Sequence, residues 1–93
     1  MNRTVLSAQL VERGALRYTP AGLPACDFGL KHESEVTEAG TLRKVSLEMR
    51  AVAIGEIAER LLKLEIGSPG TFAGFLTHQR NGRGTVLHVT EFE

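Results

Sequence analysis

The most regular hydrophobic alternation in the chain lies at residues Leu42–Ile54, which read LRKVSLEMRAVAI. Apolar side chains occupy every second position from Val45 to Ala53, and mostly polar side chains occupy the positions between them. A period of two is typical of a β-strand with one buried face. At about 3.4 Å per residue the stretch would span roughly 40 Å, which is long enough to curl around a small barrel.

Four further stretches show the same alternation, and segments rich in glycine or proline separate them. They are Arg3–Val11, Ala25–His32, Gly70–Gln79 and Thr85–Phe92. Gly29, in the middle of the second of these stretches, predicts a bend or bulge of the kind that small barrels need. The acidic segment Glu33–Gly40 is interpreted as a mobile hairpin loop, and Asn81-Gly82 as a tight hairpin turn.

One segment between these stretches changes period. Ile57, Leu61 and Leu64 follow helical spacing, and Gly67-Ser68-Pro69 would end the helix. The order of three strands, one short helix and two strands is that of the OB-fold, a five-stranded, partly open Greek-key barrel. We therefore expect a single, mainly β domain over residues 1–93, with another small α+β meander as the alternative.

Composition limits the chemistry that the chain can support. The one cysteine, Cys26, can form neither an intrachain disulfide nor a multi-cysteine metal site. Eleven Lys and Arg residues balance eleven Asp and Glu residues, whereas proteins that bind nucleic acid are usually basic. Binding of nucleic acid would therefore require positive side chains to gather on one surface. The absence of a long apolar stretch or a signal peptide predicts a cytoplasmic protein without membrane contact.

Two segments, which occur in the same order along the chain as in a known protein family, carry a resemblance to that family: Leu16–Phe28 and Gly67–Leu76. They resemble the first loop with the second strand, and the entry to the fourth strand, of bacterial single-stranded-DNA-binding proteins. Three shorter runs narrow the similarity to the short, primosomal branch of that family, namely Lys31-His32-Glu33-Ser34, Glu38-Ala39-Gly40 and Val86-Leu87-His88-Val89. No single motif is diagnostic, but the ordered set covers almost the whole chain.

The resemblance implies a non-catalytic homodimer that binds single-stranded DNA without sequence preference and needs no cofactor. It also implies a role in DNA replication restart, in which the protein bridges the PriA helicase to other primosome components. Two positions depart from the branch: Ser46 replaces a tryptophan that stacks on DNA, and Glu33 replaces a basic residue. Losing one stacking ring costs about 1–3 kcal/mol, so we expect weaker and more electrostatic binding than in those relatives.

Positive side chains are the first candidates for a DNA-binding site, because single-strand grooves use cations to follow the phosphates. In an OB-fold, the second and third strands and the loops after the first and fourth strands form the binding surface. Seven cations fall on these segments and are the predicted DNA contacts: Arg13, Arg17, Arg43, Lys44, Arg50, Arg80 and Arg83. The alternative is that they are ordinary solvated surface charges.

Aromatic rings are the second class of candidates, because bases stack on them. The only tyrosine, Tyr18, lies in the first loop and is predicted to stack on a base. The alternative is a ring that closes the mouth of the barrel against Pro20 or Leu23. The four phenylalanines are assigned mainly to the core.

Other site chemistries have little support in the sequence. His32, His78 and His88 are imaginable as metal ligands with Cys26, but Cys26 and His32 would stand about 20 Å apart on one strand. Cys26 is interpreted as a small core thiol. The sequence has no acidic cluster with the spacing of metal ligands, and no Gly-rich phosphate loop.

The first strand carries charge only near its ends, at Arg3 and Glu12, which would leave a poorly protected sheet edge. We expect a homodimer that pairs through this strand. Two alternatives to the DNA-binding adaptor stay open. One is an OB-fold dimer that acts mainly as a protein-interaction module in the primosome with weak DNA binding. The other is a binder of RNA or oligosaccharide on the same fold.

Overall fold

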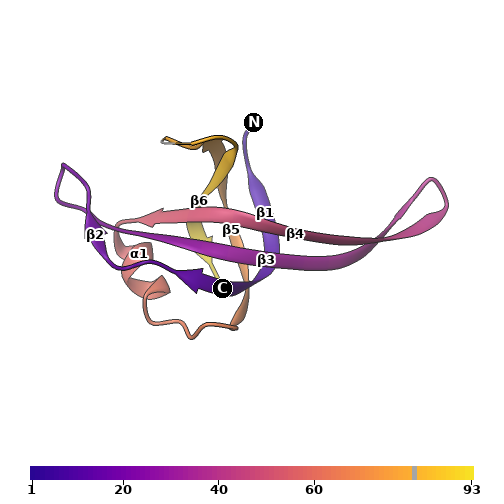
Figure 1. Ribbon diagram of the computed structural model, residues 1–93, viewed down its shortest axis with the longest axis horizontal. Coiled ribbons are helices and arrows are strands. Elements are labelled where there is room, and N and C mark those ends of the chain that lie inside the picture. The colour runs from indigo at the N-terminus through magenta and orange to yellow at the C-terminus, as the bar shows by residue number, and fades with distance from the viewer. Residues whose placement is uncertain (81) are drawn as a thin grey trace.

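Five long strands form the body of the protein in a computed structural model, which describes residues 1–80 and 82–93. The elements are β1 (Thr4–Arg13), β2 (Arg17–Tyr18), β3 (Pro24–Glu38), β4 (Thr41–Ile54), α1 (Glu56–Leu61), β5 (Pro69–His78) and β6 (Thr85–Phe92). Figure 1 shows β2 and α1 near one end of the molecule and the β3–β4 hairpin extending far beyond the barrel at the other. Within the described residues, no helix is long and apolar enough to cross a membrane.

The strands close into a barrel because β1 pairs with two neighbours. Thr4–Gln9 pair antiparallel with β5, and the register with β3 runs from Gln9 to Arg13. The sheet order β1-β5-β6-β4-β3 thus returns to β1, and the parallel β4–β6 pairing, over Arg50–Val52, is the shortest in the barrel. This strand order, with α1 between β4 and β5, confirms the predicted Greek-key OB-fold.

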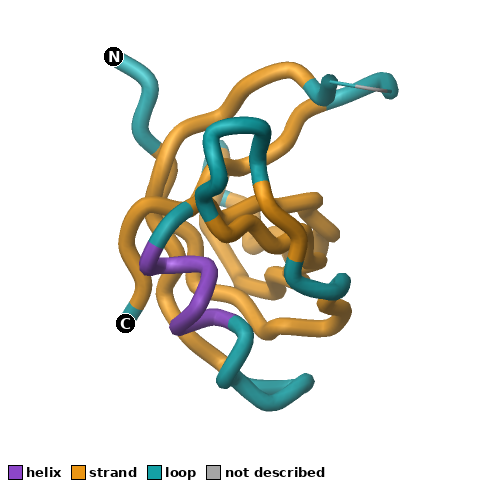
Figure 2. Tube along the Cα trace, turned by 90° about the vertical axis from the view of Figure 1, so that its left-hand side faces the viewer, coloured by secondary structure: helices purple, strands orange, loops and turns teal. Residues whose placement is uncertain are grey.

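Alternate side chains of the strands fill the interior of the barrel. The large core side chains are at most 1% exposed and include Leu10, Phe28, Leu30, Phe72 and Leu87. Cys26 is also fully buried, which confirms its predicted place in the core. α1 buries Ala58 and Leu61 against this core and lies next to the C-terminal end of β6 (Figure 2). There Phe92 stacks on Phe72, with ring centroids 5.0 Å apart.

The prediction of a mobile loop at Glu33–Gly40 is wrong, because both strands of the hairpin continue through it. β3 extends to Glu38 and stays paired with β4 as far as the Glu38–Thr41 pair. Ala39 and Gly40 have positive φ angles of 51° and 79° and make a tight two-residue turn. Most side chains of this two-stranded ribbon are exposed, so acidic residues do not oppose strand formation.

α1 is shorter than the predicted helix, because it ends at Leu61. Leu64 still packs against the core, but it does so from the turn after α1, where its N–H donates to the carbonyl of Leu61 at 3.2 Å. Gly55 supplies no side-chain cap at the start of α1, so packing rather than helix propensity holds this short segment. The predicted turn at Asn81-Gly82 cannot be compared, since residue 81 lies outside the described residues.

Candidate nucleic-acid interface

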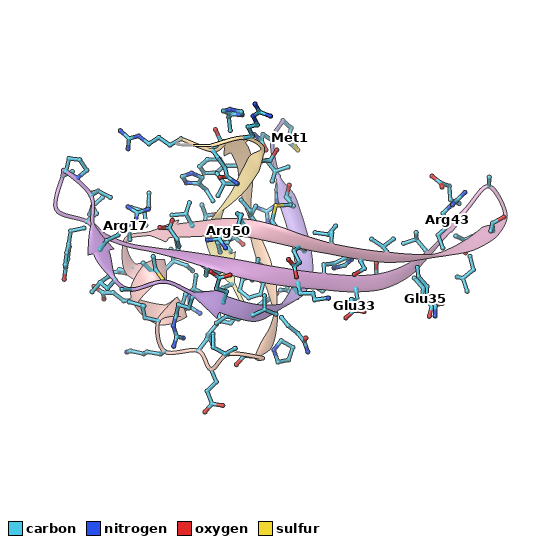
Figure 3. The ribbon with its side chains drawn as sticks, in the orientation of Figure 1. Met1, Arg17, Glu33, Glu35, Arg43 and Arg50 are labelled. Atoms are coloured by element: carbon cyan, nitrogen blue, oxygen red, sulfur yellow. The ribbon has the colours of Figure 1, made fainter. Side chains whose placement is uncertain are left out.

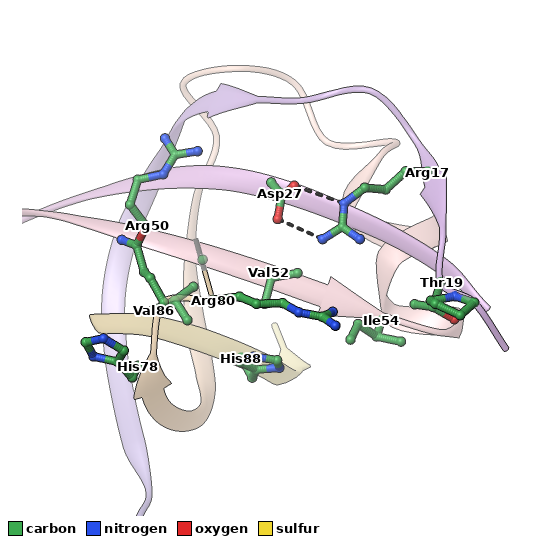
Figure 4. A pocket seen from close by; sticks show the side chains of 13 residues that line it. Arg17, Thr19, Asp27, Arg50, Val52, Ile54, His78, Arg80, Val86 and His88 are labelled. Carbon is green, nitrogen blue, oxygen red and sulfur yellow. Dashed lines mark hydrogen bonds and ion pairs between the residues drawn. The ribbon is translucent and has the colours of Figure 1, made fainter. Parts of the chain in front are cut away.

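A hollow of about 630 Å³ opens on the outer surface of the barrel between three parts of the chain. Val52 of β4 and Val86 of β6 line it, together with Thr19 after β2 and Arg80 at the start of the β5–β6 turn (Figure 4). Such a volume is typical of ligand pockets. In an OB-fold, this combination of strands and loops is the ligand-binding surface.

Three of the predicted cations, Arg17, Arg50 and Arg80, line the hollow. Arg80 lies at the start of the β5–β6 turn and Arg83 lies within the same turn, and both are exposed. Neither forms an ion pair with a carboxylate of the described residues. These two side chains are therefore available to an anionic ligand without first breaking a contact in the protein.

Arg17 is held in a fixed position by Asp27. Its Nε and Nη2 atoms donate to the two carboxylate oxygens of Asp27 at 3.0 and 3.1 Å. These hydrogen bonds raise the pKa of the Arg17 guanidinium above its usual value. Both side chains are about half exposed, so solvent screens the pair, but the two parallel bonds fix the plane of the guanidinium.

Arg50 also has a carboxylate partner, Glu12 of β1, at 3.4 Å. The two residues meet because β1 contains an irregularity. The register with β3 shifts between Leu10 and Glu12, so that Glu12 lies opposite Gly29. Gly29 is also the partner of Arg50 on β4. The bulge predicted at Gly29 is not in its own strand, whose register with β4 is continuous, because the irregularity lies in the facing strand β1.

The two hairpin cations point to opposite faces of the ribbon. Lys44 shares the outer face with Arg50, whereas Arg43 lies on the other face and forms an ion pair with Glu38 at 2.6 Å. Figure 3 shows Arg43 near the hairpin turn, far along the molecule from Arg50 and Arg17. The outer face of the hairpin carries two lysines and three glutamates: Lys31, Lys44, Glu33, Glu35 and Glu48.

Arg13 and Tyr18 do not line the hollow. Arg13 is partly buried and donates a hydrogen bond to the backbone carbonyl of Leu64, in the turn after α1. Tyr18 is 65% exposed on β2. Of the seven predicted cations, three line the hollow, and Arg13, Arg43, Lys44 and Arg83 do not.

Ten of the thirteen residues that line the hollow were not predicted as site residues, among them Asp27, Val52, His78 and His88. Side chains alternate along β6, so His88 points outward while its neighbours Leu87 and Val89 are buried. The outward position of His88 could therefore be predicted from the sequence. Its neighbours across the sheet could not, because they depend on which strand β6 pairs with. His88 pairs in register with Val52 on one side and with Phe75 on the other.

The hollow has no ready metal centre. Among residues 1–80 and 82–93, no three His, Cys, Asp or Glu side chains gather in a group that would hold an ion. Cys26 lies beneath the surface, and its thiol donates toward the carbonyls of Gly14 and Asp27. Burial, with the negative charge of Asp27 as a smaller cause, raises the pKa of the Cys26 thiol. A buried thiol that holds its proton is a poor nucleophile.

Residues 2–91 match the model of a family described as another single-strand binding protein family. The chain is similar to the replication restart protein PriB of Bordetella pertussis strain Tohama I, with 49% identity over 92 residues that cover 98% of this chain and 86% of that protein. It is also similar to the replication restart protein PriB of Nitrosomonas europaea, with 36% identity over 91 residues, or 97% and 84% of the two chains.

Solved structures show the same relationship. A PriB structure from Ralstonia solanacearum has a TM-score of 0.91 and 35% identity, and the match covers 100% of this chain and 96% of that one. A small single-stranded DNA-binding protein from Streptomyces coelicolor has a TM-score of 0.78 at 15% identity, covering 100% and 93%. The second likeness concerns the fold alone.

Proposed function

Because the chain belongs to the PriB family of replication restart proteins, we propose that it is a non-catalytic, single-stranded-DNA-binding adaptor in DNA replication restart. It binds without sequence preference through the OB face. The observation that carries the proposal is the hollow itself. Its rim bears Arg17, Arg50 and Arg80, and its surface includes the ring of His88 and the apolar floor at Val52. Phosphates and bases of a single strand need these two kinds of surface side by side.

The charges around the hollow support modest, salt-sensitive binding. Arg80 and Arg83 are unpaired with described carboxylates, whereas Arg17 and Arg50 must share their charge with Asp27 and Glu12. Two to four phosphate contacts would give a slope of log K against log salt of about −1.5 to −3. This range follows from about −0.7 per contact on a single strand.

The β3–β4 hairpin gives the strand little electrostatic support. On its outer face between Arg50 and the turn, three glutamates outnumber two lysines, and Arg43 is paired with Glu38 on the other face. At equal distance, a glutamate repels a phosphate as strongly as a lysine attracts it. The DNA path that these charges favour therefore lies over the barrel and the β5–β6 turn rather than along the hairpin.

Fluorescence anisotropy with labelled oligo-dT, duplex DNA and oligo-U, over salt from about 50 to 300 mM, tests this function. We expect saturable binding of oligo-dT that weakens with salt, and weaker binding of the duplex, whose stacked bases cannot enter the hollow. Stronger binding of oligo-U than of oligo-dT would favour an RNA-binding function. Absence of binding to every oligonucleotide would leave the alternative of a protein-interaction module with little DNA binding.

The same proposal includes a homodimer that pairs through β1. Thr4–Ala8 pair only with β5 among the described strands, so no strand covers their second edge, where the Ser7 carbonyl accepts a hydrogen bond from His32 Nδ1 at 2.6 Å. The backbone of Leu10 bonds to Gly67 and Ser68 on the β5 side. Because backbone groups alternate along a strand, those of Val5 and Ser7 point to the open side. An unpaired edge of this kind is a template for a second strand.

Primosome partners follow from family membership rather than from a contact in this chain. We propose that the protein works in the bacterial cytoplasm and contacts the PriA helicase and other primosome components. Co-elution of the purified chain with PriA on size-exclusion chromatography, with and without oligo-dT, tests this part. Separate elution under both conditions would remove PriA from the proposal without affecting DNA binding.

A further inference from the structure

Four residues on neighbouring strands form one row across the outer surface of the barrel. Asp27 of β3 pairs in register with Val52 of β4, Val52 with His88 of β6, and His88 with Phe75 of β5. Residues paired in register point to the same face of a sheet, so their side chains stand side by side. Three members of the row, Asp27, Val52 and His88, line the hollow.

The two rings at one end of the row are stacked. The ring centroids of Phe75 and His88 lie 4.8 Å apart, and the ring planes differ by 15°. Phe75 therefore covers one face of the imidazole. Val52 and Phe75 flank His88 on its two sides, so the opposite face of the imidazole lies on the side of Val52 and of the hollow.

We propose that His88, held in place by Phe75, stacks on one nucleobase of the bound single strand, and that this base lies over the side chain of Val52. The inference rests on the proposed function and adds the residue that contacts a base rather than a phosphate. Every base has a π-face, so stacking of this kind is tolerant of sequence. Val52 is 6% exposed and offers the base an apolar floor without a polar group to desolvate.

The far end of the row supplies a second wall. Neighbouring strands lie about 4.8 Å apart, so Asp27 and His88, two strands apart, are separated by roughly 9.6 Å along the row. Contact on both faces of a base would take only roughly 6.8 Å, so this interval admits one base that stacks on the imidazole without touching both walls at once. The wall facing the imidazole is the Arg17–Asp27 pair, whose two hydrogen bonds fix the guanidinium plane. A planar guanidinium also stacks on bases.

Positive side chains lie beside the space over Val52 that the stacked base would occupy. They could contact the phosphates on either side of that base. Arg50 and Arg80 line the same hollow, and His78 lies near its edge at the end of β5. The row therefore has two stacked rings at one end and an apolar floor at Val52 next to them, and cations line the hollow beside it.

A cross-strand ring pair also stabilises a sheet whether or not DNA binds. The test therefore needs a measurement that does not depend on the stability of the sheet. Anisotropy titrations compare labelled oligo-dT with an abasic oligomer of the same length and charge, at one salt concentration. We expect the natural chain to bind oligo-dT at least about fivefold more tightly than the abasic oligomer, because only the former can stack.

Substitutions at His88 then separate stacking from charge. His88→Ala is expected to weaken oligo-dT binding at least about fivefold and to leave abasic binding unchanged. His88→Phe keeps a ring and is expected to retain most of the oligo-dT affinity. As a matched control, Arg80→Ala should weaken binding of both oligomers by similar factors. Far-UV circular dichroism checks the fold of each variant, and His88→Leu replaces His88→Ala if the latter does not fold.

Three outcomes overturn the inference: equal binding of the two oligomers by the natural chain, an equal loss on both oligomers in His88→Ala, or no loss on oligo-dT. A His88→Phe variant that binds oligo-dT no better than His88→Ala also overturns it. In each of these cases binding to DNA persists, so the proposed function stands. Binding of neither oligomer by the natural chain refutes the proposed function itself.

Discussion

A carboxylate oxygen of Glu12 lies 3.4 Å from the guanidinium of Arg50, and Gly29 lies between the two residues on β3. A Cβ atom at Gly29 would stand 3.4 Å from Cβ of Glu12 and 3.6 Å from Nη1 of Arg50. The glycine therefore leaves the space that this ion pair spans. Glu12 is well exposed, so the pair is weak, but its carboxylate offsets a positive charge at the edge of the hollow.

Replacing Glu12 by Gln should strengthen binding of single-stranded DNA by a few-fold. The change frees Arg50 for a phosphate, and one more contact makes the slope of log K against log salt steeper by about 0.7. Anisotropy titrations of oligo-dT at several salt concentrations measure both quantities. An unchanged affinity with an unchanged slope would mean that the strand does not pass Arg50.

Removing Arg80 and Arg83 together should weaken oligo-dT binding several-fold and reduce the slope by about 1.4, since each lost contact accounts for about 0.7. These side chains carry the charges of the β5–β6 turn and have no carboxylate partners among the described residues. Lys63→Ala, an exposed change after α1, is the control and should leave binding unchanged. Retained affinity in the double variant would move the site away from this turn.

Lys44→Ala should reduce oligo-dT affinity less than Arg80→Ala does. Lys44 pairs in register with Glu35, and the outer face of the hairpin carries more negative than positive charge. The same anisotropy titration measures the two variants side by side. A larger loss for Lys44→Ala than for Arg80→Ala would place the DNA along the hairpin and contradict the path over the barrel.

Ser7→Pro should convert the proposed dimer into a monomer without unfolding the barrel. The Ser7 N–H points to the open side of β1, and proline is tolerated on a strand where that N–H has no partner within the sheet. Light scattering should give twice 10.1 kDa for the natural chain and for Ser7→Ala, and 10.1 kDa for Ser7→Pro. A natural chain that scatters as a monomer at micromolar concentration would remove the dimer from the proposal.

The protein should lose stability above about pH 9 because of Cys26. Burial raises the pKa of this thiol above its ordinary value of 9.0 in the folded protein. Above that value the unfolded chain loses the proton while the folded chain keeps it, so the free energy of unfolding falls as pH rises. The fall is at most about 1.4 kcal/mol per pH unit.

Urea unfolding between about pH 8 and 10 measures this effect, with Cys26→Ala as the control. The alanine variant is less stable overall because it leaves a small cavity, but its stability should depend less on pH over this range. Equal pH dependence in both proteins would show that the thiol does not titrate differently in the folded and unfolded states.

The sequence by itself determined the five long strands, but not the short β2 at Arg17–Tyr18, because alternation is a local property that only a longer stretch shows. The stretch at Leu42–Ile54 became β4 almost residue for residue, and Thr85–Phe92 became β6. The order of strands and helix was then sufficient for the fold. The prediction of a mobile loop at Glu33–Gly40 was wrong, because glutamate residues are unfavourable in a buried strand but not in an exposed two-stranded ribbon.

Only the tertiary structure decided which charges are free and which rings meet. Arg50 and Glu12 are far apart in sequence, and a one-residue irregularity in β1 brings them together over Gly29. Phe75 and His88 stack because of the register between β5 and β6, which no local pattern encodes. Strand formation depends on neighbouring positions along the chain, whereas a binding surface depends on the register between strands, and register is fixed only when the barrel closes.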